Sequence, residues 1–294
     1  MKYLITDLYS LLGKSIRDEL ISRGEDNIFP YSFNITNKEE VLKVIKSFKP
    51  DVIIHNYSLD DVDLCEKDND LCNLINVSGT NNIVEGAILN KSKLIYISSN
   101  YVFDGNNNDL FNEDSISNPI NNFGMSIRNA ENIVSKYNNS FIVRTSNVFG
   151  HGDCFVNDII DKGYKNESID VVGDQFGSLT YAPDLAFCIC DLALTDNYGI
   201  YNITNNGYAC FCEFARWILY YTNIKCDVNP ITLSQYKELN KKFIAERPKK
   251  SVLDNNKFKN TLLVELPTWY DALYRYTNNL NKGKVLIKKV TNFL

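Results

Sequence analysis

Compact apolar runs alternate with segments of helical periodicity through the first half of the chain. The apolar runs are rich in isoleucine and valine, as is typical of strands buried on both faces of a parallel sheet, and they span Lys2–Thr6, Asp51–His55, Lys93–Ser98 and Ser140–Ser146. The segments between them repeat apolar residues on one helix face, and they span Asn37–Lys49, Leu71–Leu89 and Gly124–Tyr137. This repetition predicts an α/β fold with a Rossmann-type doubly wound parallel sheet, with the first run as a central strand.

The pattern loosens after Gly150, where helices and short strands mix. We interpret residues 1–150 as a Rossmann-type, dinucleotide-binding-like domain. Residues 151–294 are predicted to form mainly a smaller α/β substrate lobe, with segments of 170–205 returning to the first domain. In such folds the ligands lie at the carboxyl ends of the strands, so we expect the lobe to close over that edge.

Composition narrows the classes of partner. The 294 residues carry a formal net charge of −5 without a basic cluster, which argues against nucleic acid or an anionic membrane. Two histidines and eight cysteines without a Cys-x-x-Cys pair predict no metal site, and Cys188 and Cys190 are interpreted as reduced core residues. Neither a signal peptide nor an apolar run long enough to span a membrane is apparent, so we expect a cytoplasmic protein that binds a small molecule or another protein.

The turn between the first predicted strand and helix is a candidate phosphate-binding turn. Gripping a phosphate there requires bare backbone, and glycines are expected at fixed offsets. This turn offers Asp7, Ser10 and Gly13, three residues apart, and only the last is a glycine.

Four motifs then resemble a known family. They are "SSNYVFDG" (98–105), "RTSNVFG" (144–150), "VVGDQFGSLTYAPDLA" (171–186) and "ERPKKSVLDNNKF" (246–258). In this order they resemble the dTDP-4-dehydrorhamnose reductase family of extended short-chain dehydrogenases. The resemblance implies a Rossmann domain that binds NADP or NAD, a C-terminal lobe that binds a nucleotide sugar such as a dTDP-linked deoxyhexose, and reduction of a 4-keto-6-deoxyhexose.

The resemblance also implies roles for individual residues. The implied cofactor-binding positions are Thr6, Asp7, Ser10, Leu12, Gly13, Asn34, Ile35 and His55. The implied substrate-binding positions are Asn100, Val102, Phe103, Asn147, Gln175 and Arg247, and the implied catalytic positions are Ser99, Phe123 and Ile127.

Two departures fall on the machinery of hydride transfer. Family members carry Tyr-x-x-x-Lys where this chain has Phe123 and Ile127, and neither replacement supplies a proton or a charge. Arg128 is turned about 100° away on a helix and cannot simply replace the lysine. In the first turn, a carboxylate at Asp7 near a pyrophosphate would cost about 4 kcal/mol per like-charge contact at roughly 4 Å. We therefore predict that NADP or NAD binding is weak or lost; the alternative role for Asp7 is to cap the following helix.

Three hypotheses remain open. The leading one is a catalytically degenerate family member that binds a nucleotide sugar and serves a binding or regulatory role in deoxysugar or polysaccharide metabolism. The second is an active NAD(P)-dependent nucleotide-sugar reductase or epimerase with a displaced acid, for which Tyr101, His55 and Tyr57 are the candidates. The third is a structural protein in a hetero-complex with an active paralogue, and a homodimer is the other assembly considered.

Overall fold

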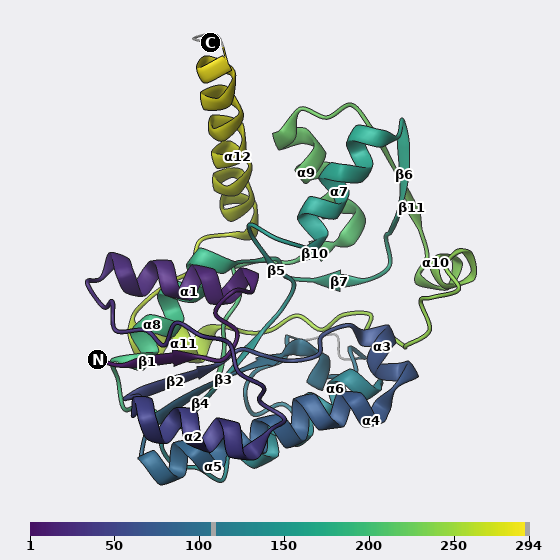
Figure 1. Ribbon diagram of the computed structural model, residues 1–294. Helices are drawn as coiled ribbons and strands as arrows, with labels where there is room; N and C mark the ends of the chain where they lie inside the picture. Colours follow the sequence, from purple (N-terminus) through teal and green to yellow (C-terminus); the bar gives the residue numbers. More distant parts are fainter. Residues whose placement is uncertain (107–109, 292–294) are drawn as a thin grey trace.

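The computed structural model describes the backbone of residues 1–106 and 110–291, and side chains as far as residue 280. Its centre is a parallel sheet of five strands (Figure 1). In spatial order these are β1 (Tyr3–Ile5), β2 (Val52–His55), β3 (Lys93–Ser99), β4 (Ser140–Thr145) and β9 (Gly199–Asn202). All four pairings are parallel, and the first three place Ile5 beside Ile54, Ile54 beside Ile95 and Ile95 beside Phe141. The predicted parallel sheet is confirmed.

The position of β1 differs from the prediction. It lies at one end of the five strands, and its other side carries a single bridge between Tyr3 and Ile28. Hydrogen bonds from the Tyr3 N–H to the Asn27 carbonyl and from the Phe29 N–H to the Tyr3 carbonyl flank this bridge. Pro30 follows directly and has no N–H to extend the ladder. The prediction that this strand is central was therefore wrong.

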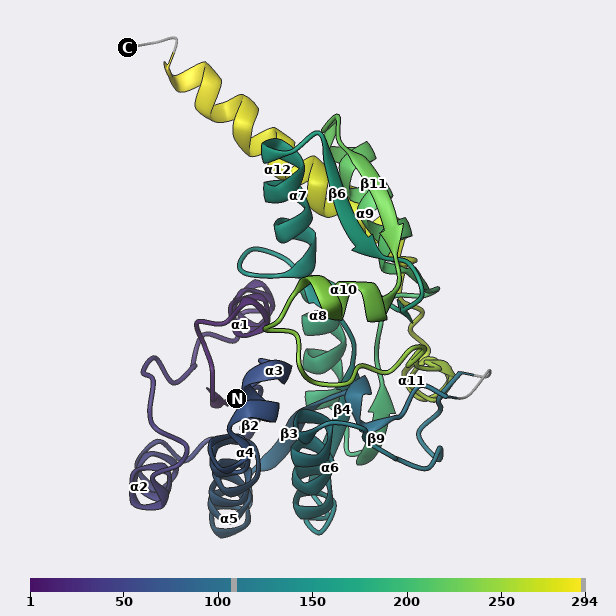
Figure 2. The ribbon, with the colours of Figure 1, turned by 90° about the vertical axis from the view of Figure 1, so that its right-hand side faces the viewer.

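Helices cover both faces of the sheet (Figure 2). On one face, α1 (Leu11–Ser22) packs beside α8 (Ala182–Ala193). On the other lie α2 (Lys38–Phe48), α5 (Thr80–Asn90) and α6 (Asn122–Val134). The alternation of a strand explains this division: Tyr3 and Ile5 belong to the core beneath α1 and α8, whereas Leu4 belongs to the core beneath α2 and α5.

The segment predicted as one helix over 71–89 is divided into three. It comprises α4 (Asn69–Asn73), a wider π-helical turn at Leu74–Gly79, and α5. The wide turn buries Asn76, whose side-chain amide donates to the Leu59 carbonyl and to the Ser126 hydroxyl. A buried amide needs such partners, and Asn76 finds them from its position in the wide turn.

The smaller lobe has its own core. That core contains Val156, Ile159, Ile169, Phe214, Ile218 and Leu273. The lobe contains α7 (Phe155–Lys165), β6 (Ser168–Val172), α9 (Phe211–Thr222), β11 (Asp227–Ile231), α10 (Leu233–Leu239) and the beginning of α12 (Trp269–Thr291), with β6 and β11 parallel. Two short strand pairs connect the lobe to the sheet: β5 (Val148–Phe149) with β8 (Thr180–Tyr181), and β7 (Phe176–Gly177) with β10 (Ala209–Cys210). The short helix α3 (Val62–Lys67) contacts α6, and α11 (Asn256–Leu262) contacts β9.

Within residues 170–205, α8 and β9 lie in the large sheet layer rather than in the lobe. Across the described residues, no helix combines the length and the apolar character needed to cross a membrane.

Candidate functional site

A cleft of about 870 Å³ lies at the carboxyl ends of β1 to β4. Its walls come from the turn after β1, the loop after β2, the end of β3, one side of α6 and the segment after β4. Eight of the sequence-predicted site residues line it: Asp7, Ser10, Leu12, Ser99, Asn100, Phe123, Ile127 and Asn147. The edge predicted to carry the ligand site is therefore the edge at which the cleft forms.

The other predicted residues are not among those lining the cleft, namely Thr6, Gly13, Asn34, Ile35, His55, Val102, Phe103, Gln175 and Arg247. Val102 and Phe103 are fully buried in an apolar cluster, and Ile35 is buried beneath Gly79. The Asn34 side chain folds back to accept hydrogen bonds from the N–H and hydroxyl of Thr36. Val102, Phe103, Ile35 and Asn34 therefore contact neighbouring parts of the protein rather than the cleft.

The turn after β1 satisfies its own backbone donors with side chains. The Asp7 carboxylate accepts a hydrogen bond from the Ser10 N–H at 3.2 Å. The Asn56 side chain makes two hydrogen bonds to the turn: its oxygen accepts one from the Asp7 N–H, and its amide donates one to the Asp7 carbonyl. A negatively charged oxygen of the protein therefore already lies against the backbone donors of this turn.

Ser10, rather than Asp7, caps the helix. The Ser10 hydroxyl accepts from the Gly13 N–H at 3.1 Å, the normal N-cap geometry of α1. The alternative in which the Asp7 side chain caps α1 is therefore wrong. Burial raises the pKa of the Asp7 carboxyl, although the N–H groups of Ser10 and Tyr9 lower it in part.

Gly13 is required by close approach. A Cβ built at this position would lie 1.8 Å from the Asp7 carbonyl oxygen, so no other residue fits without moving the turn. The one glycine retained from the phosphate-binding pattern is the glycine that packs the helix against the turn.

The wall of the cleft formed by α6 is apolar. Phe123 and Ile127 are four residues apart on one helix face and are 5% and 2% exposed. Both belong to an apolar cluster with Cys65, Cys72 and Val102. Arg128 points elsewhere, since its guanidinium contacts the Glu131 carboxylate at 3.3 Å. This wall offers neither a proton donor nor a cation.

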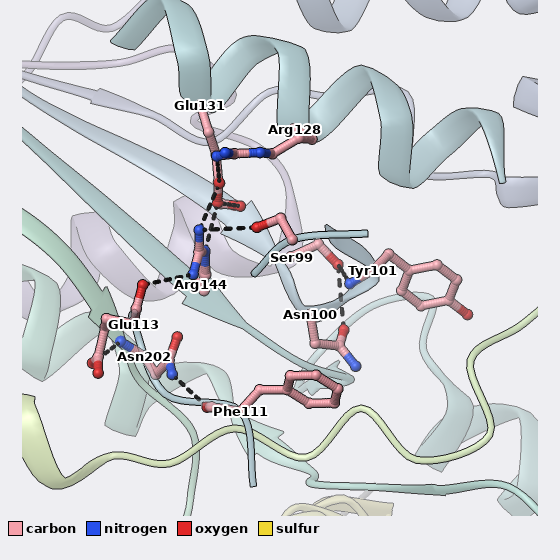
Figure 3. Close-up of polar contacts among 11 residues, drawn as sticks. Ser99, Asn100, Tyr101, Phe111, Glu113, Arg128, Glu131, Arg144 and Asn202 are labelled. Carbon is pink, nitrogen blue, oxygen red and sulfur yellow. Dashed lines mark hydrogen bonds and ion pairs between the residues drawn. The ribbon is translucent and has the colours of Figure 1, made fainter. Parts of the chain in front are cut away.

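The three candidate displaced acids lie in different surroundings. His55 is fully buried, its two ring nitrogens lie 3.0 Å from the hydroxyls of Thr6 and Thr80, and burial lowers its pKa to about 3. Tyr57 is 39% exposed and is not among the residues that line the cleft. Tyr101 does line the cleft, but its ring points away from Ser99 (Figure 3). Burial raises the pKa of the Tyr101 hydroxyl, and the charge of Arg247 lowers it in part.

A buried ion pair behind β3 was missed by the sequence reasoning. Arg144 and Glu131, 2% and 1% exposed, form two hydrogen bonds of 2.8 Å (Figure 3). The Ser98 hydroxyl donates to the same carboxylate at 2.6 Å. The only signal in the sequence was a lone charge, Arg144, in an otherwise uncharged strand, since the helical segment of Glu131 also carries Arg128. The pair ties α6 to β4 and so fixes the helix that carries the apolar wall.

Residues predicted to contact the sugar nucleotide hold the segment after α10 in place. The Arg247 guanidinium forms a two-pronged ion pair with Asp63, at 3.0 and 2.6 Å. The Gln175 amide donates to the Pro248 carbonyl, and the Asn100 amide donates to the Ser251 hydroxyl at 2.6 Å. The motifs that carry the resemblance are thereby joined to one another beside the cleft.

Asn147 has a special backbone conformation. Its φ of 43° lies in the left-handed region, which asparagine tolerates better than most residues. The side-chain amide donates to the Ser178 carbonyl and to the Ser146 hydroxyl. It faces the cleft between β4 and the short strand β5. Among the described residues, no group of three or more metal-ligating side chains could hold a metal ion.

The fold and the cleft define a protein with the architecture of Rossmann-type reductases and epimerases. A model of the family described as the RmlD substrate binding domain matches residues 1–282. The chain is 31% identical over 290 residues to a dTDP-4-dehydrorhamnose reductase of Aggregatibacter actinomycetemcomitans, covering 92% of this chain and 97% of that protein. It is 29% identical to the spore coat polysaccharide biosynthesis protein SpsK of Bacillus subtilis, covering 94% and 96%.

A similar solved structure is dTDP-4-dehydrorhamnose reductase from Bacillus anthracis in complex with NADP. Its TM-score is 0.90 at 35% identity, with 95% of this chain and 100% of that chain covered. This chain belongs to the RmlD substrate binding domain family, and it resembles the dTDP-4-dehydrorhamnose reductases within it.

Proposed function

We propose that this chain is a nucleotide-sugar-binding member of its family that does not carry out the reductase reaction and serves a binding or regulatory role in deoxysugar or polysaccharide metabolism. The observation that carries the proposal is the apolar face of α6 in the cleft. Phe123 and Ile127 stand where the family resemblance implies a tyrosine and a lysine, and the protonation of a substrate carbonyl needs a donor at that wall.

The geometry of the first turn supports the same conclusion. A dinucleotide pyrophosphate would need the backbone donors to which Asp7 is already bonded, and it would meet a carboxylate at short range. The residues present therefore do not fit the dinucleotide of the NADP-bound relative. Weak or absent NADP binding is part of the proposal.

Sugar-nucleotide binding is supported by the segments that the family resemblance assigns to the substrate. The segments of 171–186 and 246–258 retain the family motifs, and the bonds of Gln175, Arg247 and Asn100 hold them in a fixed arrangement. Ser99 and Asn147 line the same cleft and present polar groups to it. A preformed polar wall of this kind suits the hydroxyls and phosphates of a nucleotide sugar.

A thermal-shift panel with turnover assays tests the proposal. A ligand that binds only the folded state raises its melting temperature by mass action, so we expect a shift with at least one of dTDP-, UDP-, GDP- and CDP-sugars. We expect none with NADPH or NADH, and no NADPH oxidation with dTDP-4-keto-6-deoxyglucose. Turnover in the ordinary range of about 1 to 1,000 per second would overturn it.

The alternative of an active enzyme with a displaced acid has one structural candidate. Tyr101 is the only one of the three candidates that lines the cleft. If the wild-type protein turns over, Tyr101→Phe separates the explanations, because loss of activity in that variant assigns the proton to its hydroxyl. The matched control is Tyr57→Phe, which removes a hydroxyl outside the cleft lining.

A further inference from the structure

Two cysteines of the smaller lobe bring their thiols together. Cys210 ends β10, Cys212 is the second residue of α9, and their sulfur atoms lie 3.0 Å apart. Both are present as thiols. Two sulfurs at this separation lie about 1 Å farther apart than in a disulfide bond, and forming the bond has to close that gap.

The backbone, rather than the spacing, creates this contact. Cys188 and Cys190 have the same Cys-x-Cys spacing, but they lie within α8, where residues two apart do not face each other. Cys210 instead has extended dihedral angles, φ −77° and ψ 158°, and the helix begins at the next residue. The change from strand to helix between the two cysteines turns both side chains toward the same point.

The two thiols have complementary surroundings. Cys210 is partly exposed and occupies the N-cap position of α9, so its sulfur is open to a small-molecule disulfide. Cys212 is 5% exposed, and burial raises the pKa of its thiol to about 11. A Cβ added at Gly173 would lie 3.5 Å from the Cys212 sulfur, so this thiol packs against the turn after β6.

We propose that Cys210 and Cys212 form a redox-active dithiol that closes to an intramolecular disulfide by exchange with a small-molecule disulfide. The Cys210 thiolate attacks one sulfur of the oxidant, whose S–S bond breaks, and the first small thiolate leaves and takes up a proton. Cys212 then loses its proton to solvent and attacks the Cys210 sulfur, which releases the second small thiol. The two protein thiols lose two electrons, and the oxidant is reduced to two thiols.

The location couples this dithiol to the segment of Gln175, one of the residues predicted to bind the sugar nucleotide. Cys210 stands opposite Phe176 in the antiparallel pair of β10 and β7, and the Phe211 N–H donates to the Gln175 carbonyl at 3.2 Å. A covalent link draws Cys210 toward Cys212 and away from its place in this ladder. Oxidation therefore loosens the pairing that carries Gln175, independently of which ligand the cleft takes.

The test uses the full-length protein with glutathione disulfide as the probe. After exchange, free thiols are alkylated, and a protease that cuts after both Asp and Glu releases residues 197–213, which contain only these two cysteines. We expect this peptide to lose two hydrogens and to carry no alkyl group. Two alkyl groups, or a glutathione adduct that persists on the wild-type peptide, would overturn the proposal.

Variants assign the two roles. Cys212→Ser should trap a stable glutathione adduct on Cys210, whereas Cys210→Ser should leave Cys212 unmodified. Cys226→Ser, which removes another partly exposed thiol of the same lobe, is the matched control and should oxidise like the wild type. Hydrogen exchange supplies the second measurement. The Phe211 amide should exchange faster in the oxidised protein, and an unchanged rate would refute the coupling to β7.

Discussion

Replacing Asp7 should restore affinity for NADPH in graded steps. The Asp7 side chain opposes a pyrophosphate in two ways, since it carries a negative charge and it occupies the Ser10 N–H. Asp7→Asn removes the charge and keeps an oxygen that can accept the same hydrogen bond. The double variant Asp7→Gly with Ser10→Gly removes both obstacles and leaves the backbone N–H groups of the turn accessible to the pyrophosphate.

The magnitude follows from the charge. One like-charge contact at roughly 4 Å costs about 4 kcal/mol at an effective dielectric of about 20, and the partial exposure of Asp7 makes this an upper value. Because about 1.4 kcal/mol is tenfold in affinity, the glycine double variant should gain up to about a thousandfold. Asp7→Asn should gain less. Exchanging the Ser10 cap for glycine costs only a few tenths of a kcal/mol of stability.

Isothermal titration with NADPH is the assay. The variants are Asp7→Asn, the glycine double variant, the pair Phe123→Tyr with Ile127→Lys, and all four substitutions together. The variant with only Phe123→Tyr and Ile127→Lys should still fail to bind NADPH, because Asp7 remains bonded to the Ser10 N–H. The four-site variant should bind before, or without, turnover. Wild-type binding at micromolar affinity, about −8 kcal/mol, would refute the reasoning about this turn.

Two further predictions concern stability. His55 in the unfolded chain takes up a proton below about pH 6.5, whereas the buried ring stays neutral down to about pH 3. Because the unfolded state binds more protons between these values, the free energy of unfolding decreases as the pH is lowered, by up to about 1.4 kcal/mol per pH unit. Urea unfolding at pH 6.5 and 4.5 should show a smaller loss in His55→Gln, and equal losses would contradict this. Glu131→Gln should cost about 3 to 5 kcal/mol by leaving Arg144 unpaired, and denaturant unfolding within 1 kcal/mol of wild type would disprove it.

The sequence alone determined the layer architecture and the edge that carries the cleft. Runs such as Asp51–His55 and Lys93–Ser98 have consecutive apolar residues between polar ends, a pattern typical of strands buried on both faces. Their alternation with helical segments then predicts a parallel sheet, whose carboxyl edge holds the turn of Asp7 and the motif of Ser99. These features depend on local chemistry, which is written along the chain.

Only the tertiary structure decided what individual polar groups do. Asp7 could equally have capped α1, and the fold shows instead that Ser10 caps it while Asp7 bonds the Ser10 N–H. The partner of a side chain depends on residues brought together from distant positions, as with Arg144 and Glu131 or Arg247 and Asp63. No spacing rule along one chain encodes such pairs. The place of β1 at the end of the sheet was hidden for the same reason, because strand order is a property of the assembled sheet.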